Sequence, residues 1–220
     1  MVSETRERVN AEVLFRAFIT TPSGFDPAKE SLPMIVFLHG AGERGDDLSL
    51  VRIHGIPKLF GENPDYHGLR VITVSPQCPA YTVWNDVSIQ LFEFILKTAE
   101  KYNADINRIS ITGLSMGGFG TWELLISHSD FFSAGAPICG GGMDWRIPAD
   151  MKTPVRAFHG DADPTVPVEY SKFLCKAVNE RGDKAELTVY SGCGHDSWTE
   201  AYERTELIEW LSNSERSCLE

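Results

Sequence analysis

The feature that most constrains the fold is an alternation between short apolar or β-branched runs and longer segments with helical spacing. Short apolar runs that end at glycine are typical of buried strands, and apolar positions three or four residues apart are typical of helices. The expected strands are 12–20, 34–40, 68–77, 108–113, 131–140, 154–160 and 185–192. The expected helices are 86–103, 116–128, 167–182 and 199–213. This order predicts an α/β fold with a mostly parallel central sheet and helices on both faces.

One expected helix has a marked apolar face. In segment 86–103, Ile89, Phe92, Leu96 and Ala99 recur at helical spacing. Side chains at this spacing lie on one face of a helix. We therefore expect an amphipathic helix that buries these four side chains.

The length of the chain limits the number of domains. A chain of 220 residues is long enough for one domain with a substantial core, and a second full domain would be cramped. A large lid domain does not fit either. We expect residues 1–220 to form a single domain with an open or shallow site.

Charge and hydropathy exclude several kinds of partner. The formal net charge is −11, so the chain lacks the basic footprint of a nucleic-acid-binding protein. Its apolar runs are far shorter than the roughly 20 residues of a membrane-spanning helix, so we expect no membrane insertion. Segment 1–15 is charged and lacks the apolar centre of a signal peptide. We expect a cytoplasmic protein, unless a leader has been removed from the chain.

The cysteines give no sign of a metal site. The chain has five, and no two of them form a C-x-x-C pair. This scatter excludes the usual zinc spacings, and the absence of a secretion signal favours reduced thiols. We expect no metal and no organic cofactor.

A serine lies where an expected strand gives way to an expected helix. The stretch Gly-Leu-Ser-Met-Gly (113–117) has the G-x-S-x-G form of a nucleophile elbow, which needs a strand before it and a helix after it. A sharp turn lifts the Ser115 side chain above the sheet, and side chains at 113 and 117 would clash with neighbouring backbone. We expect Ser115 to be a nucleophile.

A serine nucleophile needs a base, which in turn needs an orienting acid. In an α/β-hydrolase these follow the serine in the order acid, then histidine. Only His128, His159 and His195 follow Ser115. His195 lies in a glycine-flanked loop directly after the last expected strand, so it is the expected base.

The acid is expected in the loop after the penultimate strand, which offers Asp161 and Asp163. Asp163 precedes a proline, which holds its backbone extended. Asp161 is closer to the strand and is suited to capping the turn. Asp144, Asp196 and Glu169 are more typical of solvated side chains.

The loop 37–47 follows a strand that we place near the centre of the sheet. Its small residues allow backbone N–H groups to approach a substrate oxygen. Ala41 is the expected donor from this loop, with Gly42 as the alternative, and Met116 supplies the N–H after the nucleophile. An oxyanion hole of Ala41 and Met116 follows.

Other polar residues of that loop have expected structural roles. His39 precedes Ser115 in the chain, so it is better suited to fixing the loop than to catalysis. Arg44 with Asp46 or Asp47 is expected to tie the loop down rather than to contact substrate.

Aromatic residues lie near several expected strand ends. Tyr81, Trp84, Trp145 and Trp198 are placed there, the last directly after His195. Aromatic rings at such positions can stack on a phenolic ring or a sugar. We expect Trp84, Trp198 and Trp145 to be substrate-binding residues, with packing against loops as the alternative.

Taken together, these segments resemble a known group of enzymes. The stretches that carry the resemblance are LPMIVFLHGAGERGDD, VSPQCPAYTVW, ISITGLSMGGFGTW, HGDADPTVPVEYS and GCGHDSW. They are similar to the small α/β-hydrolase esterases and predicted peptidases, near the phospholipase/carboxylesterase, polyhydroxybutyrate depolymerase and feruloyl esterase families. The resemblance runs from about Phe15 to Trp210. It implies the α/β-hydrolase fold and assigns the catalytic acid to Asp163, the base to His195 and the oxyanion donors to Ala41 and Met116.

The sequence therefore predicts a carboxylic ester hydrolase that works through an acyl-enzyme. We expect short-chain, aromatic or carbohydrate-linked esters as substrates. A serine peptidase of the same fold is the nearest alternative, and a catalytically silent α/β-hydrolase that serves as a binding module is another. The expected partner is a small-molecule ester, and a homodimer is left open.

Overall fold

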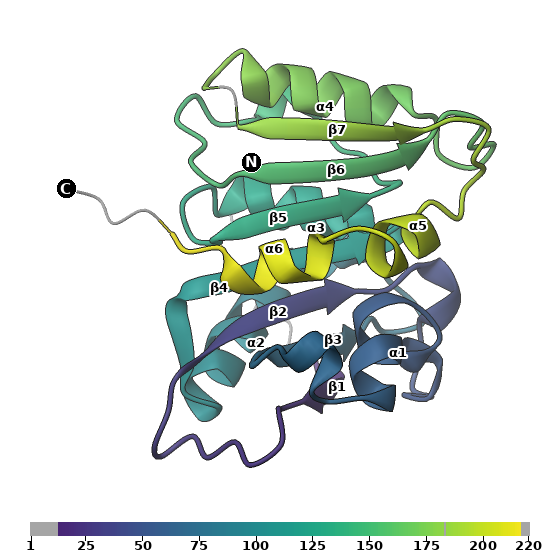
Figure 1. Ribbon diagram of the computed structural model, residues 1–220. Helices are drawn as coiled ribbons and strands as arrows, with labels where there is room; N and C mark the ends of the chain where they lie inside the picture. Colours follow the sequence, from purple (N-terminus) through teal and green to yellow (C-terminus); the bar gives the residue numbers. More distant parts are fainter. Residues whose placement is uncertain (1–12, 183, 217–220) are drawn as a thin grey trace, which may run out of the picture.

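The computed structural model describes residues 13–182 and 184–216 (Figure 1). Most of segment 1–15, on which the expectation about a signal peptide depends, lies outside the described residues. So do residue 12 of the first expected strand and Cys218. Within the described part of the chain, no helix is both long and apolar enough to cross a membrane.

The strands form one sheet of seven with the order β1-β3-β2-β4-β5-β6-β7. β1 (Arg16–Thr20) pairs antiparallel with β3 (Ile72–Gln77), and every other neighbouring pair is parallel. The remaining strands are β2 (Leu32–Leu38), β4 (Ala104–Leu114), β5 (Ala134–Ile138), β6 (Val155–Gly160) and β7 (Ala185–Tyr190). The predicted α/β-hydrolase fold, with its mostly parallel sheet, is confirmed.

Helices cover both faces of this sheet. In Figure 1, α1 (Gly55–Glu62), α5 (Trp198–Glu203) and α6 (Leu207–Asn213) lie in front of the strands, whereas α2 (Ser88–Lys101) and α3 (Met116–Ser127) lie behind them. α4 (Glu169–Asn179) packs on β6 and β7 and shares a core with α2 and α3.

The alternation of side chains along β2 explains the two layers. Met34, Val36 and Leu38 join the core that includes α2, α3 and α4. Ile35 and Phe37 point the other way, into the core that includes α1, α5 and α6. A strand buried on both faces has to be apolar throughout, which is why this segment reads as a continuous apolar run.

The structure differs from the expectation in the helix after β7. The expected helix 199–213 is two helices, α5 and α6, separated by residues 204–206. Thr205 interrupts the pattern because its hydroxyl donates a hydrogen bond to the Ala201 carbonyl and accepts one from the Leu207 N–H. Ser/Thr hydroxyls compete in this way with the helical backbone. The short helix α1 was not predicted at all.

The expected buried face of α2 is also partly wrong. Ile89 is 71% exposed and Leu96 is 38% exposed, whereas Leu91, Ile95, Thr98 and Ala99 are buried. The segment carries two apolar stripes with helical spacing, so spacing alone does not choose between them. The 3-10 turn η4 (Trp84–Val87), in which Trp84 and Val87 are buried, leads directly into α2.

The parallel strands end at a common edge. The arrowheads of β2, β5, β6 and β7 point to the same side of the molecule in Figure 1. In open α/β sheets, ligands bind outside the carboxyl ends of the strands. The loops that follow β2, β4, β5, β6 and β7 therefore meet where a site is expected.

Candidate active site

Ser115 lies in a strained turn between β4, which ends at Leu114, and α3, which begins at Met116. Its backbone angles are φ 53° and ψ −117°, a combination that is unfavourable for a residue with a side chain. A Cβ on Gly117 would lie 1.9 Å from the Leu38 carbonyl oxygen, and one on Gly113 would lie 2.5 Å from the Gly117 carbonyl oxygen. Both glycines are therefore required by close backbone approach, as the sequence predicts.

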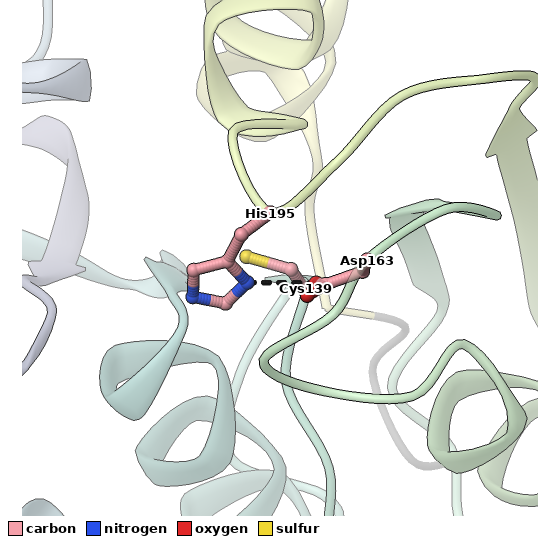
Figure 2. A group of neighbouring side chains, drawn as sticks. All are labelled: Cys139, Asp163 and His195. Atoms are coloured by element: carbon pink, nitrogen blue, oxygen red, sulfur yellow. Dashed lines mark hydrogen bonds and ion pairs between the residues drawn. The ribbon is translucent and has the colours of Figure 1, made fainter.

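The structure brings the three expected side chains together in one hydrogen-bonded chain. His195 Nε2 lies 2.8 Å from Ser115 Oγ, and His195 Nδ1 lies 2.7 Å from Asp163 Oδ2. With Nδ1–H donating to the carboxylate, Nε2 is free to accept the hydroxyl proton of Ser115. Asp163 comes from the loop after β6, and His195 from the loop after β7. Figure 2 shows the imidazole and the carboxylate facing one another.

Asp163 is held as a carboxylate by its own turn. Its side chain is fully buried, and its Oδ1 accepts hydrogen bonds from the backbone N–H groups of Thr165 (2.8 Å) and Val166 (2.9 Å). Burial opposes ionisation, but the hydrogen bonds from His195, Val166 and Thr165 outweigh it and hold the pKa of Asp163 below its ordinary value. The Asp163 side chain is thus held ionised and fixed in direction.

The neighbouring histidine, His159, has a structural environment. It is fully buried, its Nε2 lies 2.9 Å from the Val166 carbonyl oxygen, and its Nδ1 lies 2.7 Å from Ser171 Oγ. Burial lowers the pKa of His159 and favours the neutral ring. Both ring nitrogens are occupied, so His159 braces the Asp163 loop.

The alternative acid, Asp161, lies apart from the triad. Its Oδ1 accepts a hydrogen bond of 2.6 Å from the Gly192 N–H and so ties two strand-end loops together. Asp196 accepts hydrogen bonds from the Thr199 N–H and hydroxyl at the start of α5. Asp161 thus ties two loops together instead of capping its own turn, and Asp196 is exposed, as the sequence predicts.

The expected oxyanion donors are both first residues of helices. Met116 begins α3, and Ala41 begins the 3-10 turn η1 (Ala41–Glu43). An N–H in the first turn of a helix has no acceptor within that helix, so it is available to an anion. A Cβ on Gly40 would lie 3.8 Å from Ser115 Cβ, which places the start of η1 beside Ser115.

His39 fixes this loop, as expected. Its Nε2 accepts a hydrogen bond of 3.0 Å from the Cys78 N–H, and its Nδ1 lies 2.6 Å from the Gly40 carbonyl oxygen. Burial lowers the pKa of His39 to about 4, so the ring is neutral. The neutral form with Nδ1 protonated satisfies both contacts.

Two further side chains anchor the loop. Arg44 donates to the Ala41 carbonyl at 2.9 Å and to the Thr82 carbonyl at 3.3 Å, in line with the expected tether. Gln77 was not predicted, and its Nε2 donates to the carbonyls of Glu43 and Asp47 at 2.9 and 2.8 Å. Its place at the end of β3, opposite the loop, is a signal that sequence reasoning could have used.

Residues 82–208, more than half of the chain, match the model of the dienelactone hydrolase family. The chain belongs to that family. The match covers the elbow, the acid loop and the histidine loop. It agrees with the resemblance to small α/β-hydrolase esterases stated from the sequence motifs.

Curated proteins similar to this dienelactone hydrolase family member fall into two groups. A putative carboxymethylenebutenolidase of Escherichia coli (strain K12) is 26% identical over 47% of this chain and 41% of its own length. The chain thus spans less than half of that relative. Acyl-protein thioesterase 1 of Candida albicans is 26% identical over 89% of this chain and 96% of its own length.

Solved structures give the same fold. A thermostable esterase is 34% identical with a TM-score of 0.75, over 92% of this chain and 63% of that one. The feruloyl esterase module of Clostridium thermocellum, an S954A mutant complexed with sinapinate, is 14% identical with a TM-score of 0.69. The match covers 94% of this chain and 90% of that one. The latter likeness shows the fold alone.

The expected substrate-binding tryptophans have three different environments in this family member. The expectation for Trp84 is wrong: its side chain is fully buried, and its Nε1 donates to the His39 carbonyl at 2.9 Å. Its ring packs against His39, with ring centroids 5.0 Å apart, and leaves no surface exposed. Trp198 packs edge-on against the His195 ring, with centroids 5.4 Å apart. Trp145 is 73% exposed on the 3-10 turn η5 (Asp144–Arg146) beside α4.

Sequence reasoning missed Cys139, which directly follows β5. Its side chain is fully buried, and its backbone has the positive φ of 39° that is rare outside glycine. Its thiol lies beside Asp163 and His195 (Figure 2). One ligand atom from each of these three side chains lies close enough to the other two to share a metal ion. Burial raises the pKa of Cys139 to about 12, so it is a neutral thiol rather than a nucleophile. Its position at an expected strand end was the available signal.

The four cysteines of the described residues, Cys78, Cys139, Cys175 and Cys193, are free thiols.

Proposed function

We propose that the protein is a serine hydrolase that cleaves carboxylic esters through an acyl-enzyme. The observation that carries this proposal is the continuous hydrogen-bonded chain from Asp163 through His195 to Ser115, with distances of 2.7 and 2.8 Å. A silent binding module has no need to keep a strained serine in register with a histidine and a buried carboxylate. Family membership and the thermostable esterase structure support the same chemistry.

The geometry supports a two-step reaction. His195 Nε2 takes the Ser115 hydroxyl proton as Oγ attacks the ester carbonyl, and Asp163 stabilises the imidazolium that forms. The N–H groups of Met116 and Ala41 hold the oxyanion, aided by the positive end of the α3 dipole. His195 then protonates the leaving alcohol. A water molecule, activated by the same ring, releases the acid and restores Ser115.

The size of the substrate follows from what covers the site. Between β5 and β6 the chain forms only the short turn η5, so no helical lid lies over Ser115 from that segment. An open site favours short acyl chains or esters of larger alcohols that extend into solvent. Trp198 beside His195 offers an aromatic wall, which suits an aromatic or carbohydrate-linked ester.

Thioesters are a second candidate substrate. Acyl-protein thioesterase 1 of Candida albicans aligns with nearly the whole of both chains, which favours hydrolysis of an acyl–sulfur bond by the same triad. Attack on a thioester needs the same nucleophile and oxyanion donors as attack on an ester. The leaving thiolate needs less help from His195 than an alkoxide does.

A panel of substrates tests the proposal. The panel consists of p-nitrophenyl acetate, butyrate and octanoate, methyl ferulate, an acetylated sugar, an acyl thioester and a peptide anilide. The wild type is compared with Ser115→Ala and with Ser127→Ala, which removes an exposed serine at the far end of α3. We expect hydrolysis of short or aromatic esters, a loss of about 10³-fold or more in Ser115→Ala, and a normal rate in Ser127→Ala.

Cleavage of the anilide without cleavage of any ester would show that the protein is a peptidase and not an esterase. Inactivity of the wild type on the whole panel would remove it.

A further inference from the structure

We propose that Cys139, Asp163 and His195 form a zinc-binding site, and that a zinc ion held there switches the proposed hydrolase off. The binding itself depends only on these three side chains. The loss of activity rests on the proposed function.

The three donor atoms have the spacing of a metal site. One sulfur, one carboxylate oxygen and one ring nitrogen all lie within 4.8 Å of one another. Zinc bonds of about 2.0–2.3 Å in a tetrahedral site put ligand atoms roughly 3.3–3.8 Å apart. Closing around an ion thus changes the separations between donor atoms by about 1.5 Å or less. Figure 2 shows the thiol beside the contact between the carboxylate and the imidazole.

The ligand types select zinc over harder cations. A thiolate with an imidazole suits zinc, whereas calcium and magnesium prefer oxygen ligands alone. The ligands come from the ends of β5, β6 and β7, far apart in sequence. The expectation of no metal depended on short ligand spacings, which cannot reveal a site assembled by the fold.

The charges of the site also balance. A thiolate and a carboxylate together carry the two negative charges that neutralise Zn²⁺, while His195 binds as a neutral ligand. The side chains of Cys139 and Asp163 are both fully buried, so a neutral complex avoids placing a net charge in the protein interior.

An unused polar group lies next to the thiol. Ser197 is fully buried, its Oγ lies against the Cys139 thiol, and within the described chain that oxygen has no well-formed hydrogen bond. The buried hydroxyls of Ser75, Ser110 and Ser133 are also without a partner, so Ser197 is distinguished by its contact with the Cys139 thiol. A zinc-bound thiolate is a stronger acceptor than a neutral thiol, so the Ser197 hydroxyl would gain a partner when the ion binds.

The backbone directs the thiol into the cluster at a cost. Cys139 keeps a positive φ of 39° while its N–H donates to the Phe158 carbonyl at 2.8 Å. Glycine adopts this conformation without strain. A cysteine held in it, with its thiol beside the triad, is the kind of outlier that functional sites retain.

The chemistry of inhibition is a change of tautomer. The ion bonds to the Cys139 sulfur, whose proton goes to solvent, and to an oxygen of Asp163. It also bonds to His195 Nδ1, whose proton is transferred to Nε2. An Nε2 that carries a proton cannot accept the hydroxyl proton of Ser115. The nucleophile is then not activated, and removal of the ion restores the original tautomer.

Binding is measured first, without reference to activity. The Ser115→Ala protein is titrated with Co²⁺, a spectroscopic substitute for zinc, and the near-ultraviolet charge-transfer absorption of a cobalt–thiolate bond is recorded. Zinc is then added to displace the cobalt. We expect a band that saturates at one ion per chain and disappears with zinc.

Matched variants identify the thiol. Cys139→Ala and Cys139→Ser in the same background are expected to lose the band, and two substitutions allow for one that folds poorly. Cys175→Ala removes a buried thiol on α4, and Cys193→Ala removes the partly exposed thiol of the histidine loop. Both controls are expected to keep the band. Absence of a band in the parent, or its persistence in a folded Cys139 variant, overturns the proposal.

Inhibition is measured second, on the Ser115-containing protein. We expect zinc to abolish hydrolysis, a chelator to restore it, and Cys139→Ala to need at least about tenfold more zinc for half-inhibition. A protein that hydrolyses esters but forms no thiolate band refutes the zinc site alone. A protein with the band but no hydrolysis refutes the proposed function alone.

Discussion

The Cα of Gly160, the last residue of β6, faces the backbone of the loop that carries His195. A Cβ at position 160 would lie 2.4 Å from the Gly194 carbonyl oxygen and 2.2 Å from that of Cys193. These carbonyls belong to the backbone, so a rotamer change cannot relieve the contact. Gly160 thus sets how closely the loop that carries His195 approaches the end of β6, after which Asp163 follows.

Replacing this glycine tests that relationship. Gly160→Ala is expected to push the His195 loop outward and to lower kcat at least about tenfold, because a displacement near 1 Å in a catalytic group costs that much or more. Gly194→Ala is the matched control, since a Cβ there meets nothing within 4 Å. Ester hydrolysis and thermal unfolding are measured for both variants. Equal activity in the two would show that the contact does not position His195.

The assignment of the acid predicts a large difference between two neighbouring carboxylates. Asp163→Asn removes the negative charge that faces His195 Nδ1 and is expected to lower kcat about 10²–10⁴-fold with little change in KM. Asp161→Asn keeps an oxygen for the Gly192 N–H and is expected to stay within about twofold of the wild type. Steady-state kinetics on one ester compares them. A reversed order of the two effects would move the acid to Asp161.

The buried His39 predicts acid-labile stability. Its folded pKa of about 4 lies below the ordinary histidine pKa of 6.5, so between these values the unfolded chain binds the proton first. The contribution of His39 to the free energy of unfolding is therefore fully present above pH 6.5 and is lost as the pH falls toward 4. The loss from this group is about 2–3 kcal/mol by pH 4.5. His159 contributes in the same direction, because burial also lowers its pKa.

Urea unfolding at pH 7 and pH 4.5 measures this effect. His39→Gln retains an acceptor for the Cys78 N–H without a titratable ring, so it is expected to flatten the pH dependence. At pH 4.5 most Asp163 side chains are still ionised, because the pKa of this carboxyl lies below its ordinary value. The comparison between pH 7 and pH 4.5 therefore reports mainly on the histidines. An unchanged slope in His39→Gln would mean that another group controls acid unfolding.

The two tryptophans near the site should respond differently to substitution. Trp84→Phe removes a buried indole and its hydrogen bond to the His39 carbonyl, and is expected to reduce the free energy of unfolding by about 1–3 kcal/mol. Trp198→Ala removes the ring that packs on His195 and is expected to lower kcat/KM for aromatic esters more than for acetate. Chemical denaturation and a pair of substrates separate the effects. A selective KM change in Trp84→Phe would contradict its placement in the core.

Much of the fold follows from local patterns. The seven strands and the helices α2, α3 and α4 were predicted because each is marked by an apolar run or a glycine end. The break between α5 and α6 was not, since it depends on the Thr205 side chain choosing local backbone partners. The orientation of α2 was also missed, because the helix carries two apolar stripes and its own spacing does not choose between them.

The candidate site divides in the same way. Ser115, Asp163 and His195 could be located by chain order and strand ends, and the structure brings them into contact. Burial could not be judged from position alone: Trp84 follows a strand end yet is fully buried. Cys139 and Gly160 are important because the fold places them against residues about 20–60 positions away in the sequence. No local sequence pattern records such contacts.

The central claim is that Ser115 is a nucleophile activated by His195. A fluorophosphonate probe reacts with such a serine regardless of which ester the enzyme prefers, and mass spectrometry of the digested protein locates the adduct. We predict one adduct per chain, on the peptide that contains Ser115, with labelling lost in Ser115→Ala and strongly slowed in His195→Ala. No adduct on the folded wild type, or an adduct that persists in Ser115→Ala, would contradict the account.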